Sequence, residues 1–290
     1  MPVKIKSLYF FATIALVVGA VQIYAADTAP SFKWKTGKIE IGDNIAVMNL
    51  PGDFRYLDSK QSKTVIEDLW GNPKGSADGV LGMIFPSKMN PVADDSWGIV
   101  ITYEDSGFVE DDDADKIDYE ELLSTMKEEI KDSNPERKKA GYGSIELVGW
   151  ATPPHYDKAS HKLFWAKELK FEGNNENTLN YNFRILGRKG VLVLNAVSGM
   201  KQLKDIESKS APLLASVNFS DGNRYAEYVP GKDRVAEFGI AALIAGGAAA
   251  AAKTGLLKSM WVGILAFKKF IILGLIAAGG FVKKIFFGKK

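Results

Sequence analysis

The most suggestive catalytic spacing in the chain is the run 124–127, Ser-Thr-Met-Lys. In serine enzymes with a Ser-x-x-Lys motif, the serine is a nucleophile at the start of a helix, and the lysine one turn later assists proton transfer. Here Ser124 falls inside a helix that we expect to begin at Asp118. The Lys-Thr-Gly triplets that would complete such a site lie at 35–37, before the serine, and at 253–255, in the C-terminal tail. The context therefore argues against catalysis by Ser124 and Lys127.

A run of acidic residues from Glu110 to Asp115 has the spacing of a calcium-binding loop at its start. An EF-hand requires glycine at the sixth position and glutamate at the twelfth, but this chain has Lys116 and Leu122 there. We therefore interpret the run as a solvated loop whose charge suits the N-terminus of the helix that follows. Weak surface binding of a divalent ion is the alternative.

The two histidines, His155 and His161, lie six residues apart, across an expected Pro-Pro turn and the start of a strand. A metal pair would need both on one face with a carboxylate, and Asp157 is the nearest in sequence. We expect two histidines at the solvent edge of a hairpin. Either one is nevertheless a candidate general base.

Tryptophans are frequent in the part of the chain before residue 238: Trp34, Trp70, Trp97, Trp150 and Trp165. Core packing is the expected role. Because adjacent strand residues point to opposite faces, one of Phe164 and Trp165 is a candidate for an exposed aromatic patch that binds a partner or a sugar polymer.

Composition excludes several other chemistries. The chain contains no cysteine, which rules out disulfides, cysteine nucleophiles and thiolate metal sites. It has no Gly-rich phosphate loop, and we predict no cofactor. Residues 27–237 carry a net charge of −8, which argues against a nucleic-acid partner.

Hydrophobic periodicity predicts an α+β fold, an antiparallel sheet of about six or seven strands with two or three packed helices. The Gly-Asp-Asn turn at 42–44 indicates an early hairpin, and Asp58 and Asp118 are candidate helix N-caps. The helices are expected at 58–70, 119–132 and 200–217, and the later strands at 80–85, 97–103, 145–150, 161–171, 178–186 and 191–197.

The two ends of the chain predict a membrane destination. Residues 1–26 have the basic, apolar and small-residue regions of a signal peptide, so residues 27–237 would form an exported domain. Residues 238–290 contain no acidic residue and carry a charge of +8. We expect a transmembrane helix at 238–257, completed by snorkelling of Lys253.

We expect residues 258–290 to form a lysine-rich apolar helix, either interfacial or a second span. The two lysines near its middle cost about 5 to 7 kcal/mol on insertion, against about 4 to 7 kcal/mol returned by its apolar residues. The residues expected to face the membrane or its interface are Lys253, Lys258, Trp261, Lys268, Lys269, Lys283 and Lys284.

Several motifs resemble the family known as domain of unknown function 2167. They are Asp68-Leu69-Trp70-Gly71-Asn72-Pro73, Asp94-Asp95-Ser96-Trp97, Val148-Gly149-Trp150, the run 161–169, Thr178-Leu179-Asn180-Tyr181-Asn182 and the run 266–270. The resemblance implies a bacterial membrane-anchored protein without an established activity, so it assigns no catalytic residue. The order of elements also resembles the Mog1/PsbP-like fold.

These observations together predict a non-enzymatic binding or structural module. It would be anchored in the bacterial inner membrane, with its main domain on the periplasmic side. Its expected partners are anionic lipid headgroups and an envelope protein or a second copy, the latter through the Gly/Ala-rich helix. Two alternatives stay open: an envelope hydrolase using His155 or His161 with an acidic partner, and a protein that perturbs membranes through its cationic tail.

Overall fold

The computed structural model describes residues 31–72, 74–93, 95–139 and 141–246. The chain divides into a unit of residues 1–32 and a unit of residues 33–290. All that follows concerns the described part of the second unit. The predicted signal peptide and most of the predicted tail lie outside the described residues.

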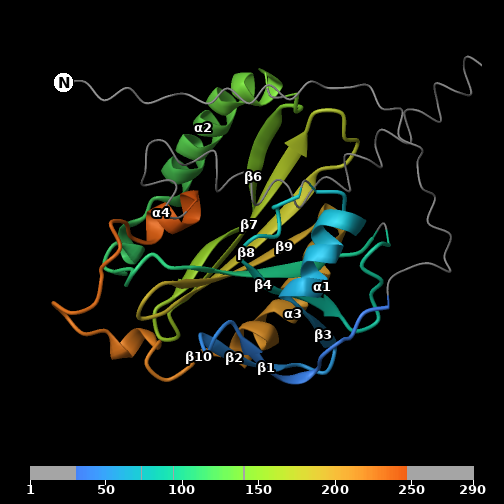
Figure 1. The fold of residues 1–290 in the computed structure, drawn as a ribbon. Helices are drawn as coiled ribbons and strands as arrows, with labels where there is room; N and C mark the ends of the chain where they lie inside the picture. The colour runs from blue at the N-terminus through green and yellow to red at the C-terminus, as the bar shows by residue number, and fades with distance from the viewer. Residues whose placement is uncertain (1–30, 73, 94, 140, 247–290) are drawn as a thin grey trace, which may run out of the picture. The chain divides into compact units, whose positions relative to one another are not determined.

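A seven-stranded antiparallel sheet forms the centre of the domain, in the order β3-β4-β5-β9-β8-β7-β6 (Figure 1). Its strands are β3 (Phe54–Asp58), β4 (Val80–Pro86), β5 (Gly98–Glu104), β6 (Ile145–Asp157), β7 (Lys162–Phe171), β8 (Thr178–Leu186) and β9 (Val191–Gly199). The predicted meander from β6 to β9 is confirmed, because each of these strands pairs with the next along the chain.

A second, three-stranded sheet has the order β1-β2-β10. The predicted hairpin supplies β1 (Gly37–Ile41) and β2 (Ala46–Leu50), and β10 (Val217–Phe219) pairs with β2. The expectation of a single sheet was incomplete: the predicted helix at 200–217 takes in Val217, and no strand is expected at residues 218–219. Apolar residues alternate with a polar one in β10, a pattern too short to be separated from a helix by periodicity.

Four α-helices surround the sheets: α1 (Ser59–Lys63), α2 (Tyr119–Lys139), α3 (Leu203–Ser216) and α4 (Ile240–Ala245). Both predicted N-caps are confirmed. The Asp58 carboxylate accepts a hydrogen bond from the Gln61 amide at 3.1 Å, and the Asp118 carboxylate accepts two, both 3.0 Å long, from Glu120 and Glu121. The predicted end of α2 at Asp132 was wrong, since this helix continues through Pro135 to Lys139.

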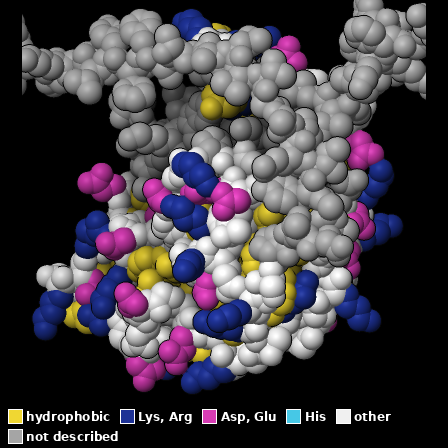
Figure 2. Space-filling view, turned by 45° about the vertical axis from the view of Figure 1, so that its right-hand side comes forward, with side chains coloured by type: hydrophobic (Ala, Val, Ile, Leu, Met, Phe, Trp, Pro, Cys, Tyr) yellow, Lys and Arg dark blue, Asp and Glu magenta, His cyan; other side chains and the backbone are white. Residues whose placement is uncertain are grey.

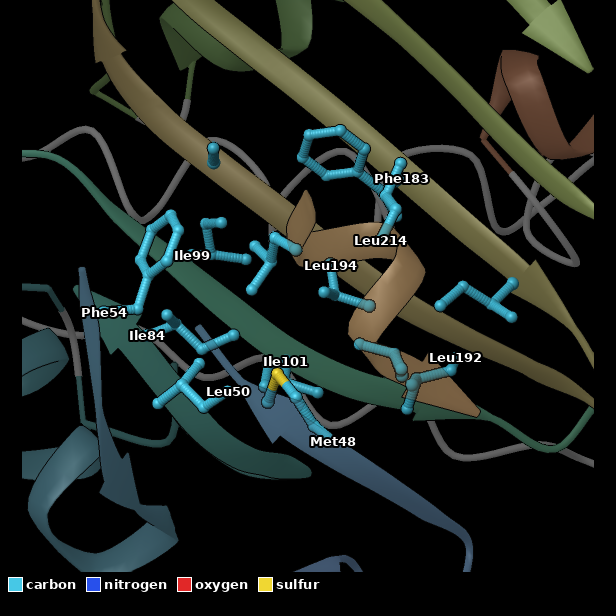
Figure 3. Close-up of a cluster of buried hydrophobic side chains, with 14 of the residues drawn as sticks. Met48, Leu50, Phe54, Ile84, Ile99, Ile101, Phe183, Leu192, Leu194 and Leu214 are labelled. Atoms are coloured by element: carbon cyan, nitrogen blue, oxygen red, sulfur yellow. The ribbon is translucent and has the colours of Figure 1, made fainter. Parts of the chain in front are cut away.

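The main core lies between one face of the seven-stranded sheet and the layer made by α3 and the small sheet. Figure 3 shows Phe183, Leu192 and Leu194 of the large sheet beside Leu214 of α3 and Met48 of β2. Alternate residues of β8 and β9 reach this core, as period-2 patterning requires.

The opposite face of the sheet is covered near β6 and β7 by α2 and α4 (Figure 1). Leu169 and Val197 pack with α2, whereas Leu163, Trp165 and Leu186 pack with α4. Asp113 accepts hydrogen bonds from the first amides of α4, at 3.1 Å from Ile240 and 3.2 Å from Ala241. The acidic loop is therefore tied to the start of α4.

The expected Pro-Pro turn at 153–154 was wrong, because both prolines lie inside β6. This strand is at the edge of the sheet, and its register with β7 shifts between Thr152 and His155. An edge strand with a bulge tolerates residues that lack an N–H donor. The hairpin turn falls instead just before Lys162, and His161 occupies it with a φ of 52°.

Lys162, the first residue of β7, links the sheet to the C-terminal end of α3. Its ammonium donates to the backbone oxygens of Leu214 at 2.6 Å and Val217 at 3.3 Å. Carbonyls at a helix C-terminus lack partners within the helix and carry the negative end of its dipole. The lysine therefore donates to two backbone oxygens, and its positive charge lies at the negative end of the helix dipole.

We expect Lys162→Met to lower the free energy of unfolding by about 1–2 kcal/mol, because these carbonyls lose a charged donor. Urea denaturation followed by circular dichroism measures the change. Lys170→Met on the same strand is the matched control, since Lys170 is exposed; its change is expected to stay within about 0.5 kcal/mol. Equal losses in the two variants would contradict the assignment.

Candidate functional site

The residues predicted to face the membrane lie outside the described residues: Lys253, Lys258, Trp261, Lys268, Lys269, Lys283 and Lys284. The predicted span at 238–257 begins within the described part, where α4 buries Ile240, Leu243 and Ile244 against the domain. No helix among the described residues combines the length and the apolar character needed to cross a membrane.

Ser124 and Lys127 are both exposed on α2. Ser124 lies in the body of the helix that Asp118 caps, as the sequence predicts, and not at its start. The geometry of a serine nucleophile at a helix N-terminus is therefore missing at this position.

Asp111 from the acidic loop meets Tyr156 of β6 and His161 of the β6–β7 turn. The Tyr156 hydroxyl donates to Asp111 Oδ2 at 2.8 Å and lies 3.2 Å from His161 Nδ1. His161 Nδ1 is 3.6 Å from the same carboxylate oxygen. We call these three residues the Asp–Tyr–His cluster; the Asp111 and His161 side chains are 13% and 28% exposed.

An aromatic stack extends from this cluster. The His161 ring stacks on Tyr225 with centroids 3.9 Å apart, Tyr225 lies 4.4 Å from Phe108, and Phe108 stacks on Tyr228 at 3.8 Å. The Tyr225 hydroxyl donates to the Val109 backbone oxygen at 2.9 Å. The stack thus joins the acidic loop, the β6–β7 turn and the segment after β10.

Burial raises the pKa of Tyr156, and the hydrogen bond to Asp111 raises it further. The phenol therefore stays protonated and acts as the donor to Asp111. When Nδ1 of His161 carries a proton, its acceptor is the phenol oxygen, and Nε2 is then the basic nitrogen. Among the hydrogen bonds found in the described parts of the chain, none joins His161 to a serine or threonine hydroxyl.

His155 lies apart from this cluster. It is exposed on β6, and its ring centroid is 5.1 Å from that of Phe164. The predicted partner Asp157 instead accepts hydrogen bonds from Ala159 and Ser160 in the turn. In the residues that the structure describes, no group of three or more His, Asp or Glu side chains is placed to hold a metal ion.

The predicted core role is confirmed for Trp70, Trp97 and Trp165, each of them 1% exposed. Trp34 and Trp150 are half-buried, and so is Phe164. Trp165 is thus not an exposed aromatic. It belongs instead to a polar group on the face of the sheet that α2 and α4 flank.

We call this group the polar sheet face, and it consists of Trp165, Lys167, Asn180, Asn182, Arg184 and Asn195. The register places Trp165 beside Asn182, which in turn lies beside Asn195 of β9. Lys167 lies beside Asn180 on one side of this row. Leu163 pairs with Arg184 on the other side, so the two cations flank the central row.

The three asparagines form a directed hydrogen-bond chain. Asn182 Nδ2 donates to Asn180 Oδ1 at 2.8 Å, and Asn180 Nδ2 donates to Asn195 Oδ1 at 3.2 Å. Asn180 and Asn182 are only 6% and 4% exposed. Buried amides make such bonds because leaving them unpaired is costly.

The other polar groups of this face are less well partnered. Trp165 Nε1 is buried without a hydrogen-bond acceptor. The Arg184 guanidinium lies 5.0 Å from the Trp165 ring centroid and donates to the Phe183 backbone oxygen at 3.0 Å. Within the described ranges, no carboxylate lies within 4.0 Å of Lys167 or Arg184.

Desolvation lowers the pKa of both cations. The pKa of Lys167 falls to about 8, first through burial and then through the nearby charge of Arg184. Burial lowers the pKa of Arg184 to about 10, and the attraction of Glu104 opposes this shift. Both side chains are still mainly charged at neutral pH.

Sequence reasoning missed both groups. The polar sheet face had a signal: polar residues at 180, 182 and 184 alternate with the apolar residues 179, 181, 183 and 185, and Trp165 and Lys167 are two apart. The Asp–Tyr–His cluster had no such signal, since its residues come together only through the fold.

No curated protein matches the sequence. Similar solved structures include the cyanobacterial PsbP (CyanoP) of Synechocystis sp. PCC 6803, with 10% identity, a TM-score of 0.33 and coverage of 68% of this chain and 98% of that one. LpqN of Mycobacterium tuberculosis, involved in cell envelope biogenesis, has 14% identity, a TM-score of 0.32 and coverages of 64% and 91%. The Ran-binding protein Mog1p of Saccharomyces cerevisiae has 9% identity, a TM-score of 0.32 and coverages of 69% and 100%.

At these TM-scores the similarities carry no conclusion about activity, and the Mog1/PsbP-like fold stays a prediction. The family comparison is of a different kind. The model of the family described as protein of unknown function (DUF2167) matches residues 33–279. Because this match spans most of the 290 residues, the chain belongs to the DUF2167 family that its motifs resemble.

Proposed function

We propose that the domain is a non-enzymatic binding module of the bacterial envelope and that its ligand docks on the polar sheet face. One observation carries the proposal. A buried indole N–H without an acceptor lies on the same face as two cations that have no carboxylate within 4.0 Å in the described residues.

Such groups are costly for the folded protein on its own. A buried donor without an acceptor loses the hydrogen bonds that water gives it in the unfolded chain, and a desolvated cation loses more. A ligand that supplies acceptors reverses these losses on binding. A few directed polar groups within an otherwise apolar environment are also typical of ligand sites.

Charges of both signs are mixed on the face that Figure 2 draws. Figure 2 shows Lys and Arg side chains interspersed with Asp and Glu over the coloured part of that view. Several exposed cations of the described residues have carboxylate partners, such as Lys74 with Asp68 and Lys201 with Glu176. The cations of the polar sheet face differ in being half-buried and in having no carboxylate of the described residues within 4.0 Å.

The envelope location in this proposal is supported by the signal-like residues 1–26 and the cationic apolar residues 238–290. The test uses a reporter enzyme that is active only outside the cytoplasm. We expect its fusion after Asp221 to be active. A fusion after Lys290 reports whether the second tail segment crosses the membrane. An inactive Asp221 fusion would overturn the location.

Binding at the polar sheet face is testable without knowing the ligand. In the full chain held in neutral detergent micelles, acetic anhydride is expected to modify Lys167 readily, because its lowered pKa supplies the neutral amine. Envelope lipid, sugar-polymer and protein fractions are then added separately. We expect one fraction to slow acetylation of Lys167 at least about tenfold, and of the exposed Lys170 less than about twofold, as mass spectrometry measures.

Trp165→Phe keeps an aromatic side chain but removes the N–H together with the five-membered ring, so it is expected to weaken this protection. Circular dichroism checks that the variant is folded. Equal protection of Lys167 and Lys170, or no protection by any fraction, would contradict binding at this face.

The Asp–Tyr–His cluster favours the hydrolase alternative, since it contains a histidine held by a Tyr–Asp pair. That alternative predicts turnover of p-nitrophenyl esters that is lost in His161→Gln. Our proposal predicts hydrolysis no faster than in buffer.

A structural role of the cluster predicts instead that Tyr156→Phe lowers the free energy of unfolding by about 1–3 kcal/mol, because the Asp111 carboxylate loses its donor. Tyr142→Phe is the matched control, since Tyr142 is exposed, and its effect is expected to be within about 0.5 kcal/mol. Urea denaturation measures both. An unchanged stability in Tyr156→Phe would argue against the structural role.

A further inference from the structure

The polar groups that the sheet face leaves available are nearly all donors. An ammonium, a guanidinium and an indole N–H donate and cannot accept, and these belong to Lys167, Arg184 and Trp165. The ligand of this face must therefore supply acceptors.

The asparagine chain adds one more donor. Within the chain, the side-chain oxygens of Asn180 and Asn195 each accept a hydrogen bond from the neighbouring asparagine. Asn195 Nδ2, at the end of the chain, donates to no group in the described residues. The opposite end leaves the Asn182 oxygen as an acceptor, suited to a hydroxyl of the ligand.

The cations are held near each other in spite of their like charge. They flank the Trp165–Asn182 pair in the register, and Arg184 is close enough to lower the pKa of Lys167. The surrounding domain is acidic, with a net charge of −8 over residues 27–237, yet no carboxylate of the described residues lies within 4.0 Å of either cation, and Glu104 attracts Arg184 from farther away. An anion between them would replace repulsion by two attractions.

We infer that the polar sheet face binds a tetrahedral phosphate-type oxyanion through Lys167, Arg184, Trp165 and Asn195. This inference rests on the proposed function and names the ligand class for it. Donors from three adjacent strands lie at separate points on one face, which suits a group with acceptors in three dimensions better than a planar carboxylate, whose acceptors lie in one plane. Guanidinium and ammonium groups are also the usual phosphate partners in proteins.

The first test is calorimetric titration of the full chain in neutral detergent micelles with inorganic phosphate, and with acetate and chloride at equal ionic strength. Phosphate is expected to bind at least about tenfold more tightly than acetate. Lys167→Met is expected to weaken phosphate binding at least about tenfold, and Lys170→Met less than about twofold. Phosphate binding no tighter than acetate, or unchanged in Lys167→Met, would overturn the inference.

The thermal unfolding of the free protein gives a second readout. Lys167 makes no ion pair in the described residues and is desolvated, so Lys167→Met is expected to raise the melting temperature while it weakens binding. Arg184→Met removes a cation–π contact as well and need not fold, so the inference is judged on Lys167→Met and Trp165→Phe. A lowered melting temperature in Lys167→Met would indicate a structural lysine.

The pH dependence of binding is fixed by the charge of Lys167. The ammonium form predominates below pH about 8, and a bound dianion stabilises that form. Affinity is therefore expected to be constant at lower pH and to fall as the pH rises through about 8, by up to about tenfold per unit. Sulfate is the probe for this series, since its own charge does not change over this range. A flat profile between pH 6.5 and 9.5 would contradict the role of Lys167.

The source of the phosphate is decided by comparing glycerol 3-phosphate with a short-chain phosphatidic acid. Tighter binding of the second indicates a lipid headgroup, and equal binding indicates a soluble phosphate. If an envelope fraction protects Lys167 from acetylation but phosphate does not, the binding module stands and the oxyanion inference fails. If neither protects it, both fail.

Discussion

The strict alternation of side chains along β8 and β9 is the constraint on which the domain depends. These strands lie inside the seven-stranded sheet, so their residues alternate between its two faces, one packed on α3 and the small sheet and the other flanked by α2 and α4. One face receives mainly apolar residues, such as Phe183 and Leu194, and seals the core against α3 and the small sheet; Ser198 is a buried polar residue on that side. A register slip of one residue would place Asn180 and Asn182 in that core, at a cost of several buried unpaired amides. The polar residues of one face therefore help to specify the register of the other.

The turn between β6 and β7 contacts segments that lie outside the two sheets, namely the acidic loop and the segment after β10. His161 adopts a left-handed conformation in its turn and presents its ring to Tyr225. The start of the acidic loop and the segment after β10 then meet at this ring stack. The same segment is joined to the β8–β9 turn by the ion pair of Arg188 with Asp233, at 2.7 Å. Since α4 follows directly and is capped by Asp113, its position depends on the same contacts. The acidic run thus acts in part as an internal tie, and not only as a solvated loop.

Sequence patterning was sufficient to predict local structure, but it did not predict which distant strands and side chains contact each other. The Asp58 and Asp118 caps, the helix at Tyr119 and the four-strand meander depend on neighbours in sequence, so spacing alone predicted them. β10 joins β2 across more than 160 residues, and Asp111 meets Tyr156 across 45, distances at which one sequence carries no contact information. The predicted turn at Pro153-Pro154 was wrong for another reason. A turn preference was assigned to residues whose edge position in the sheet tolerates proline.

The polar sheet face shows why an unfavourable feature points to function more strongly than a favourable one. Apolar residues at 167 and 184 would extend the cover that Leu163 and Leu169 already make with α4 and α2, and they would remove two desolvation costs. The asparagine chain does not need them, because its bonds are internal. The indole N–H of Trp165 is likewise dispensable for packing, since the ring alone fills the space. The Lys167 ammonium and the Trp165 indole N–H are donors without a hydrogen-bond partner in the described residues on one face, whereas Arg184 also contacts the Trp165 ring. The proposed oxyanion would give the two unpartnered donors a common acceptor.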